Sequence, residues 1–132
     1  MRFLSIAALF GALALAKPVI RATGETVTVT DLIINQSNDH LDAVTFKLNV
    51  DDGITCSASN TTFPSPVVSC GTSDYRFALV PGKEVIYTLR LYHDLGSGAG
   101  IYGEATVPCN GPIPSLCEQV GLGFNVTLDS EP

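Results

Sequence analysis

The fold is decided by one stretch, VIYTLRLYHDLGSGAGIYGEATV, which covers residues 85–107. Apolar and polar residues alternate in both of its halves, with the period of two that is typical of a half-buried β-strand. A glycine-rich segment, residues 96–100, separates the halves and lacks the Lys-Ser/Thr pair of a phosphate-binding loop. The sequence therefore predicts two antiparallel strands, residues 84–92 and 102–107, with a flexible connection between them.

One register of these two strands gives complementary pairs on both faces. On the outward face it forms an aromatic pair, a salt bridge and a threonine pair, namely Tyr92–Tyr102, Arg90–Glu104 and Thr88–Thr106. Each such pair is worth about 0.2–1 kcal/mol. On the inward face it places large residues opposite small ones, namely Leu91 with Gly103, Leu89 with Ala105 and Tyr87 with Val107. We therefore expect this register, with the two tyrosines side by side in solvent.

Two more hairpins follow from the same alternation. The first turns at residues 51–53, and its expected opposed pairs are Val50–Ile54, Leu48–Cys56 and Phe46–Ala58. Gly53 supplies the left-handed residue that such a three-residue loop needs. The second turns at residues 81–83, and its expected pairs are Leu79–Val85, Phe77–Tyr87 and Tyr75–Leu89.

Two further segments, residues 25–34 and 122–128, also read as strands. Residues 115–120 read as a single helical turn, too short to form a helix alone. Seven or more short strands joined by turns predict an all-β fold: a single antiparallel β-barrel or sandwich with two disulfides.

Residues 1–16, MRFLSIAALFGALALA, have the pattern of a secretory signal peptide. The apolar run after Arg2 is too short to span about 30 Å of hydrocarbon, and Ala14-Leu15-Ala16 is a typical cleavage signal. We therefore expect residues 17–132 to form a single secreted, extracellular β-barrel domain. Loss of Arg2 would change the net charge from −6 to −7, which argues against nucleic acid and membrane as partners.

Four cysteines lie in this domain, and an exported chain of this size favours two disulfides. The hairpins favour the neighbouring pairs Cys56–Cys70 and Cys109–Cys117, one of three connectivities that four cysteines allow. Three tripeptides match the N-glycosylation acceptor pattern, and they begin at Asn35, Asn60 and Asn125.

Catalytic and metal-binding patterns are weak in this sequence. His93-Asp94 is the best acid–base pair, and Ser97 and Ser115 are conceivable nucleophiles, but no serine lies in a G-x-S-x-G elbow. The acidic residues that invite a weak calcium site lack EF-hand spacing, and they are Asp39, Asp42, Asp51 and Asp52. The cysteines lack zinc-site clustering. We therefore expect no enzyme activity, no metal and no cofactor.

A surface remains as the candidate functional site. Its outward residues Tyr92, Tyr102 and Ile86, with Arg90 and Glu104, would form an aromatic patch on a polar sheet. Such a patch is typical of a protein-binding face, although scattered apolar residues are also common on surfaces. We expect a partner protein or a second copy of the chain to contact it.

The chain resembles a known family, the small secreted fungal proteins typified by the Alternaria major allergen (Alt a one). The resemblance spans about residues 25–129 and is carried by five segments, FKLNV (46–50), TCSA (55–58), SCG (69–71), YGEATVPC (102–109) and CEQVG (117–121). The order of the four cysteines is similar to that of the family's two intramolecular bridges. Residues 17–50 lack the additional cysteine that links two subunits of the typical allergen. The resemblance therefore implies no covalent dimer and leaves room for non-covalent self-association.

The resemblance implies a non-catalytic fungal protein of the allergen or effector type, which binds a host plant-defence protein or a small ligand. The alternative is a small secreted hydrolase, or a carbohydrate-active or cell-wall protein. A cleft that holds an acid, a base and a nucleophile together would distinguish the two.

Overall fold

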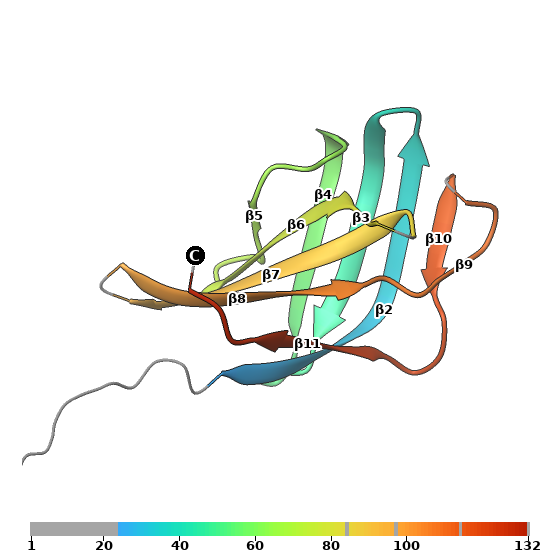
Figure 1. Cartoon of the computed structure of the whole chain (residues 1–132). Coiled ribbons are helices and arrows are strands. Elements are labelled where there is room, and N and C mark those ends of the chain that lie inside the picture. Colours follow the sequence, from blue (N-terminus) through green and yellow to red (C-terminus); the bar gives the residue numbers. More distant parts are fainter. Residues whose placement is uncertain (1–23, 84, 97, 114, 132) are drawn as a thin grey trace, which may run out of the picture.

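The computed structural model describes residues 24–83, 85–96, 98–113 and 115–131 (Figure 1). Residues 1–16, the expected signal peptide, and Ser97 lie outside the described residues. The described residues form ten strands and no helix: β2 (Glu25–Ser37), β3 (His40–Leu48), β4 (Ile54–Thr62), β5 (Val68–Ser69), β6 (Tyr75–Pro81), β7 (Tyr87–Gly96), β8 (Ala99–Thr106), β9 (Cys109–Asn110), β10 (Leu116–Gln119) and β11 (Phe124–Leu128). This part of the chain contains no apolar helix of membrane-spanning length.

The large sheet has six strands and is organised by β2. Its order is β4-β3-β2-β10-β9, and β11 also pairs with β2. The first half of β2 pairs with β11 and its second half with β10. A bulge lies between Thr30 and Ile33, where Asp31 adopts a φ of 57°. Because a bulge bends its strand, β2 changes direction here, and it pairs with β11 before the bend and with β10 after it (Figure 1).

The small sheet has the order β5-β6-β7-β8 and crosses the large sheet as the second layer of a sandwich (Figure 1). The expectation of an all-β antiparallel fold is confirmed, and the form it takes is the sandwich, since the two sheets do not close into a barrel. The outer edge of β8 is covered where Ser130 and Tyr102 exchange backbone hydrogen bonds of 2.8 and 3.1 Å.

The core lies between the two sheets and is apolar throughout. Its most completely buried side chains come from both layers and include Val27, Val29, Ile34, Phe46, Leu48, Phe77, Leu79, Tyr87, Leu89, Leu91, Val126 and Leu128. Phe46 and Phe77 meet edge to face across the layers, with ring centroids 4.9 Å apart. Edge-to-face contact is a favoured aromatic geometry, so the two rings join the sheets at the centre of the core.

The register predicted for β7 and β8 is confirmed. Tyr92 pairs with Tyr102, Arg90 with Glu104, and Leu91 with Gly103. A Cβ atom on Gly103 would lie 1.8 Å from the carbonyl oxygen of Thr127. The small residue opposite Leu91 is therefore required because β8 and β11 approach each other there.

The registers predicted for the other two hairpins are wrong, but the residue faces are mostly right. The structure pairs Leu48 with Ile54, a shift of two residues. It pairs Leu79 with Leu89, a shift of four. An even shift keeps each side chain on its face, so both cores form as expected. Both loops are longer than predicted, and Val85 lies exposed in the second loop instead of facing inward.

The helical turn predicted at residues 115–120 is also wrong. Residues 116–119 form β10, in which Cys117 pairs with Ile34 of β2. A segment of four residues is too short to show a clear periodicity, so its pairing with β2 decides its conformation. Leu122, expected in the last strand, lies before β11 and is 96% exposed.

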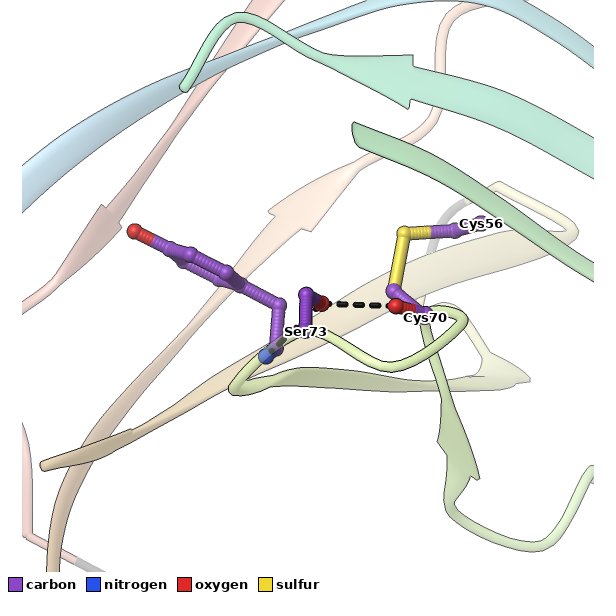
Figure 2. The surroundings of a disulfide bond; sticks show 4 residues. Cys56, Cys70 and Ser73 are labelled. Atoms are coloured by element: carbon purple, nitrogen blue, oxygen red, sulfur yellow. Dashed lines mark hydrogen bonds between the residues drawn. A yellow bond between two sulfur atoms is a disulfide. The ribbon is translucent and has the colours of Figure 1, made fainter. Parts of the chain in front are cut away.

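Two disulfides, Cys56–Cys70 and Cys109–Cys117, join the neighbouring cysteines. Figure 2 shows the first, which ties the buried Cys56 of β4 to the turn before β6. The Ser73 hydroxyl donates to the carbonyl oxygen of Cys70 at 2.6 Å, and the backbone N–H of Tyr75 donates to the Ser73 hydroxyl at 3.2 Å. The bond and these two hydrogen bonds therefore close the polar segment between β4 and β6.

Candidate functional site: the outer face of the small sheet

The candidate site is an aromatic face on the solvent side of the small sheet. We define it by the outward side chains of Arg76 in β6, Tyr92 and Arg90 in β7, and Tyr102 and Glu104 in β8. All lie at positions that alternate with buried residues along their strands. The alternation that builds the core therefore also displays these five side chains.

The two tyrosines form the centre of the aromatic face. Their ring centroids are 5.7 Å apart and the rings are inclined by 27°, so they are stacked. The guanidinium carbon of Arg76 lies 5.4 Å from the Tyr92 ring, and that of Arg90 lies 6.0 Å from the Tyr102 ring. These distances are within the range of cation–π attraction. The arginines therefore hold the rings in place.

Each arginine is also paired with a carboxylate. Arg90 Nε donates to Glu104 Oε2 at 2.6 Å, and Arg76 Nη2 donates to Asp94 Oδ1 at 2.8 Å. Hydrogen bonds to Tyr92 and Glu104 raise the pKa of Arg90, while its partial burial acts in the opposite direction. The face is therefore ordered by charge-assisted contacts and carries little net charge.

Ile86 does not belong to this face. It lies in the loop before β7, six positions from Tyr92, which is roughly 20 Å along a strand. The structure thus brings four of the five predicted partner-binding residues together and leaves Ile86 at the other end of the sheet. It adds Arg76, which sequence reasoning missed because the shifted register hid its pairing with Tyr92.

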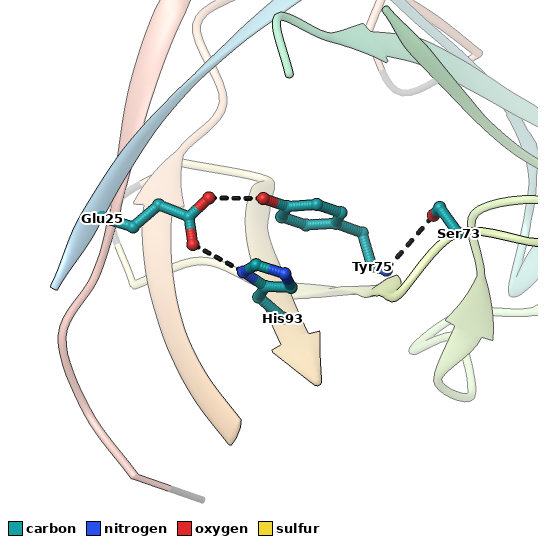
Figure 3. A network of polar contacts seen from close by, with 4 residues as sticks. All are labelled: Glu25, Ser73, Tyr75 and His93. Carbon is teal, nitrogen blue, oxygen red and sulfur yellow. Dashed lines mark hydrogen bonds and ion pairs between the residues drawn. The ribbon is translucent and has the colours of Figure 1, made fainter. Parts of the chain in front are cut away.

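A second polar cluster joins the two sheets (Figure 3). Glu25 of β2 accepts a hydrogen bond from the Tyr75 hydroxyl, and its other oxygen lies 2.6 Å from His93 Nδ1. The Tyr75 and His93 rings stack with centroids 4.1 Å apart. Burial and, next, the hydrogen bond to Glu25 raise the pKa of Tyr75 well above its usual value. Tyr75 pairs directly with His93 in the observed register. The predicted register paired Tyr75 with Leu89 instead, so the contact between Tyr75 and His93 was not expected.

The catalytic candidates that the structure describes, which exclude Ser97, are not assembled into a site. His93 contacts Glu25, whereas Asp94 pairs with Arg76 on the opposite face of the sheet. The Ser115 hydroxyl donates to the carbonyl oxygen of Pro112. Among the described residues, no hydroxyl or thiol group hydrogen-bonds to His93, whose partner is the Glu25 carboxylate.

The acidic residues named as calcium candidates lie at the two ends of β3, with Asp39 and Asp42 at one end and Asp51 and Asp52 beyond the other. Asp51 and Asp52 take positive φ values of 48° and 67° in the loop after β3. Asp42 accepts a hydrogen bond from the Ser37 hydroxyl and lies 3.6 Å from His40 Nε2. Within the described ranges, no three His, Cys, Asp or Glu side chains converge as a metal site.

The glycosylation candidates differ in accessibility. Asn60 and Asn125 are exposed, and Asn125 Oδ1 accepts a hydrogen bond of 2.8 Å from the Thr28 hydroxyl. Asn35 is half-buried and pairs with strands on both sides, Ala43 in β3 and Leu116 in β10. Asn60 and Asn125 are therefore the sterically simpler acceptors.

Comparison with known proteins gives one consistent picture. No protein-family model matches the sequence. The chain is 39% identical to effector protein PevD1 of Verticillium dahliae over 138 aligned positions, which cover 96% of this chain and 85% of PevD1.

The fold is similar to two crystal structures of the Alternaria alternata allergen Alt a 1. Their TM-scores are 0.61 and 0.60 at 19% and 18% identity. The matched regions cover 78% of this chain in both cases, and 86% and 91% of the allergen chains. The chain is thus a protein of the effector and allergen type, and it belongs to the Alt a 1-like family of fungal proteins that includes PevD1.

Proposed function

We propose that this protein is a secreted, non-catalytic effector that binds an extracellular host protein through its aromatic face. The relationship to PevD1 supports the effector class. Two disulfides are typical of an oxidising, extracellular compartment. A plant-defence protein is the host partner that the family resemblance suggests.

The observation that carries the proposal is the stacked, half-exposed pair Tyr92–Tyr102 between two arginines. Tyrosine and arginine are enriched at interface hot spots. A tyrosine offers large contact area and loses little conformational entropy when it is immobilised. Here the arginines and carboxylates already fix the rings, so binding requires little further ordering.

The ring geometry argues against a carbohydrate platform. The two tyrosines turn their faces towards each other, and a guanidinium group covers part of each ring. Their π faces are therefore already used by neighbours. Their edges and hydroxyl groups remain for a partner, and these suit a protein surface with hydrogen-bonding groups.

The alternative, a small hydrolase, finds one supporting element in the Glu25–His93 contact. A carboxylate that orients a histidine is part of a nucleophile-activating system, but the nucleophile must also lie within hydrogen-bonding reach. Ser73 lies at the backbone end of Tyr75, whereas His93 lies beside the Tyr75 ring (Figure 3), and the Ser73 hydroxyl bonds to Cys70. The cluster therefore fits a role in joining the sheets better than one in catalysis.

Charge is distributed unevenly over the molecule. The basic residues in the described part of the chain are Lys47, Arg76, Lys83 and Arg90. Three of them lie in the small sheet or its loops, whereas the whole chain has a net charge of −6. A basic partner would thus be attracted from a distance and would meet a nearly neutral face on contact.

Binding by variants of the mature chain tests this function. The chain, residues 17–132, is immobilised and exposed to plant apoplastic fluid, and a captured protein is purified and titrated. Tyr102→Ala should weaken binding by about tenfold or more. Thr45→Ala, an outward change on the large sheet, is the matched control and should bind normally. Equal binding by both variants would contradict the proposed face.

A further inference from the structure

A groove lies beside the loop between β6 and β7, at the end of the small sheet away from Tyr92. It consists of two hollows that meet at Val85 and Thr106, residues that line both. One hollow has a volume of about 370 Å³ and the other about 380 Å³. Each is within the size range of small-molecule sites.

The first hollow is apolar. It is lined by Val85, Ile86, Val107, Pro108 and Ile113, together with Thr106 and Cys109. Val85, Ile86 and Ile113 are 42%, 38% and 40% exposed, so three of the large apolar residues at the surface gather around one cavity. Single exposed apolar residues are common, but a cluster that lines a hollow points to a ligand.

The walls of this hollow are held by covalent and backbone bonds. The Cys109–Cys117 disulfide closes the loop that carries Ile113. The backbone N–H of Val107 donates to the carbonyl oxygen of Tyr87 at 3.1 Å. A site with a preformed wall loses little entropy on binding.

The second hollow has both polar and apolar lining residues and contains one cation to which the described residues supply no ionic partner. Its lining includes Lys83, Thr88 and Glu104. The Glu104 carboxylate is already neutralised by Arg90, whereas Lys83 forms no ion pair with any described residue. An anionic head group placed here would therefore lie beside the positive charge of Lys83.

We propose that this groove binds an amphipathic monoacid, with its apolar body against Ile113 and Val85 and its carboxylate beside Lys83. The charge pattern selects an acid over a neutral molecule of the same shape. The volume of the apolar hollow suits the apolar part of a small molecule better than a single protein side chain. The hollow that holds the apolar body shares no residue with the aromatic face, whereas Glu104 belongs to the face and also lines the head-group hollow.

Decanoate is a suitable probe, because it combines one apolar chain with one carboxylate. In methyl-labelled protein, its titration should shift the resonances of Val85, Ile86 and Ile113 in a saturable way, with Kd below about 1 mM. Ile113→Ser should weaken binding by about tenfold. Lys83→Gln should weaken decanoate binding by about threefold, as expected for an exposed ion pair, and leave the binding of 1-decanol unchanged.

Leu122→Ser is the matched control, since it removes a more exposed apolar side chain from a different surface. It should leave decanoate binding unchanged. The proposal is overturned if no saturable binding occurs, if the shifts centre on Leu122, or if both serine variants weaken binding equally. Equal affinity for decanol and decanoate, unaffected by Lys83→Gln, would overturn the acid-binding role of Lys83. Ile113 is in an exposed loop, and unchanged spectra elsewhere would establish that its variant folds.

Discussion

The outer faces of the two sheets are built by the same alternation but present different chemistry. On the large sheet the outward positions where β2 pairs with β11 hold short polar residues that bond to one another. The Thr28 hydroxyl donates to Asn125 at 2.8 Å, and the hydroxyls of Thr26 and Thr127 lie 3.4 Å apart. On the small sheet the outward positions hold two tyrosines and two arginines.

This difference separates what folding requires from what it does not. β-Branched polar residues suit a solvated sheet surface, so this part of the large sheet needs no other explanation. Exposed Tyr and Arg add little core and cost more side-chain entropy to order than threonine does. Their concentration on one sheet therefore supports the proposed role in contact with another molecule.

The largest expected effect concerns the connection between the sheets. Cys56→Ser and Cys70→Ser should each lower the free energy of unfolding by about 3 kcal/mol, because both open the same loop of 14 residues. Urea denaturation of the two variants measures this, and their values should agree. Peptide mapping without reduction that joined Cys56 to Cys109 or Cys117 would contradict the pairing.

The next effect concerns the place where β8 meets β11. Gly103→Ala should cost about 2–3 kcal/mol, because its Cβ would overlap the backbone oxygen of Thr127 and the strands would have to separate. Gly100→Ala is the control, since its nearest neighbour would be 3.1 Å away. Equal urea midpoints for the two variants would show that β8 and β11 are not in close contact.

On the aromatic face, Tyr92→Ala should change binding more than stability. Tyr92 is half-buried on the outer side, so we expect a loss of no more than about 1 kcal/mol in unfolding free energy. Partner binding should weaken by about 1.4 kcal/mol or more if Tyr92 is a hot spot. Calorimetry measures both quantities. If the variant unfolds, the Tyr92 ring contributes to the core. If it folds and binds the partner normally, the aromatic face is not the binding site.

The smallest effect is on the inner cluster at high pH. The raised pKa of Tyr75 means that the unfolded chain loses this proton first, near pH 10, while the folded chain retains it. Stability should therefore be unaffected by this group below about pH 10 and fall above it, by up to about 1.4 kcal/mol per pH unit. Tyr75→Phe should reduce that slope in denaturation experiments between pH 9 and 11. An unchanged slope would contradict the burial of the Tyr75 hydroxyl against Glu25.

The sequence predicted best the region where side chains had strong preferences for each other. The β7–β8 register rests on three complementary pairs on one face and on a glycine opposite Leu91 on the other. The other two hairpins lacked such pairs, and their loop lengths were inferred from turn residues alone. Asp51, Asp52 and Gly53 all adopt positive φ in a loop longer than three residues, which no turn signature distinguishes from a tight turn.

The candidate site was likewise predicted correctly only where the strand register was well determined. Tyr92, Tyr102, Arg90 and Glu104 were placed together correctly because they belong to the well-determined pair of strands. The Glu25–Tyr75–His93 cluster was missed because it depends on the β6–β7 register and on packing between two sheets. Contacts between layers are set by the whole core, and no local pattern in the chain encodes them.

Site-specific photo-crosslinking tests the central claim most directly. Benzoylphenylalanine is placed singly at Tyr102 on the small sheet and at Thr45 on the large sheet, and each folded variant is irradiated with the captured host protein. We expect a crosslink from position 102 and none from position 45. Crosslinks from position 45 alone, or equally from both positions, would contradict the assignment of partner binding to the aromatic face.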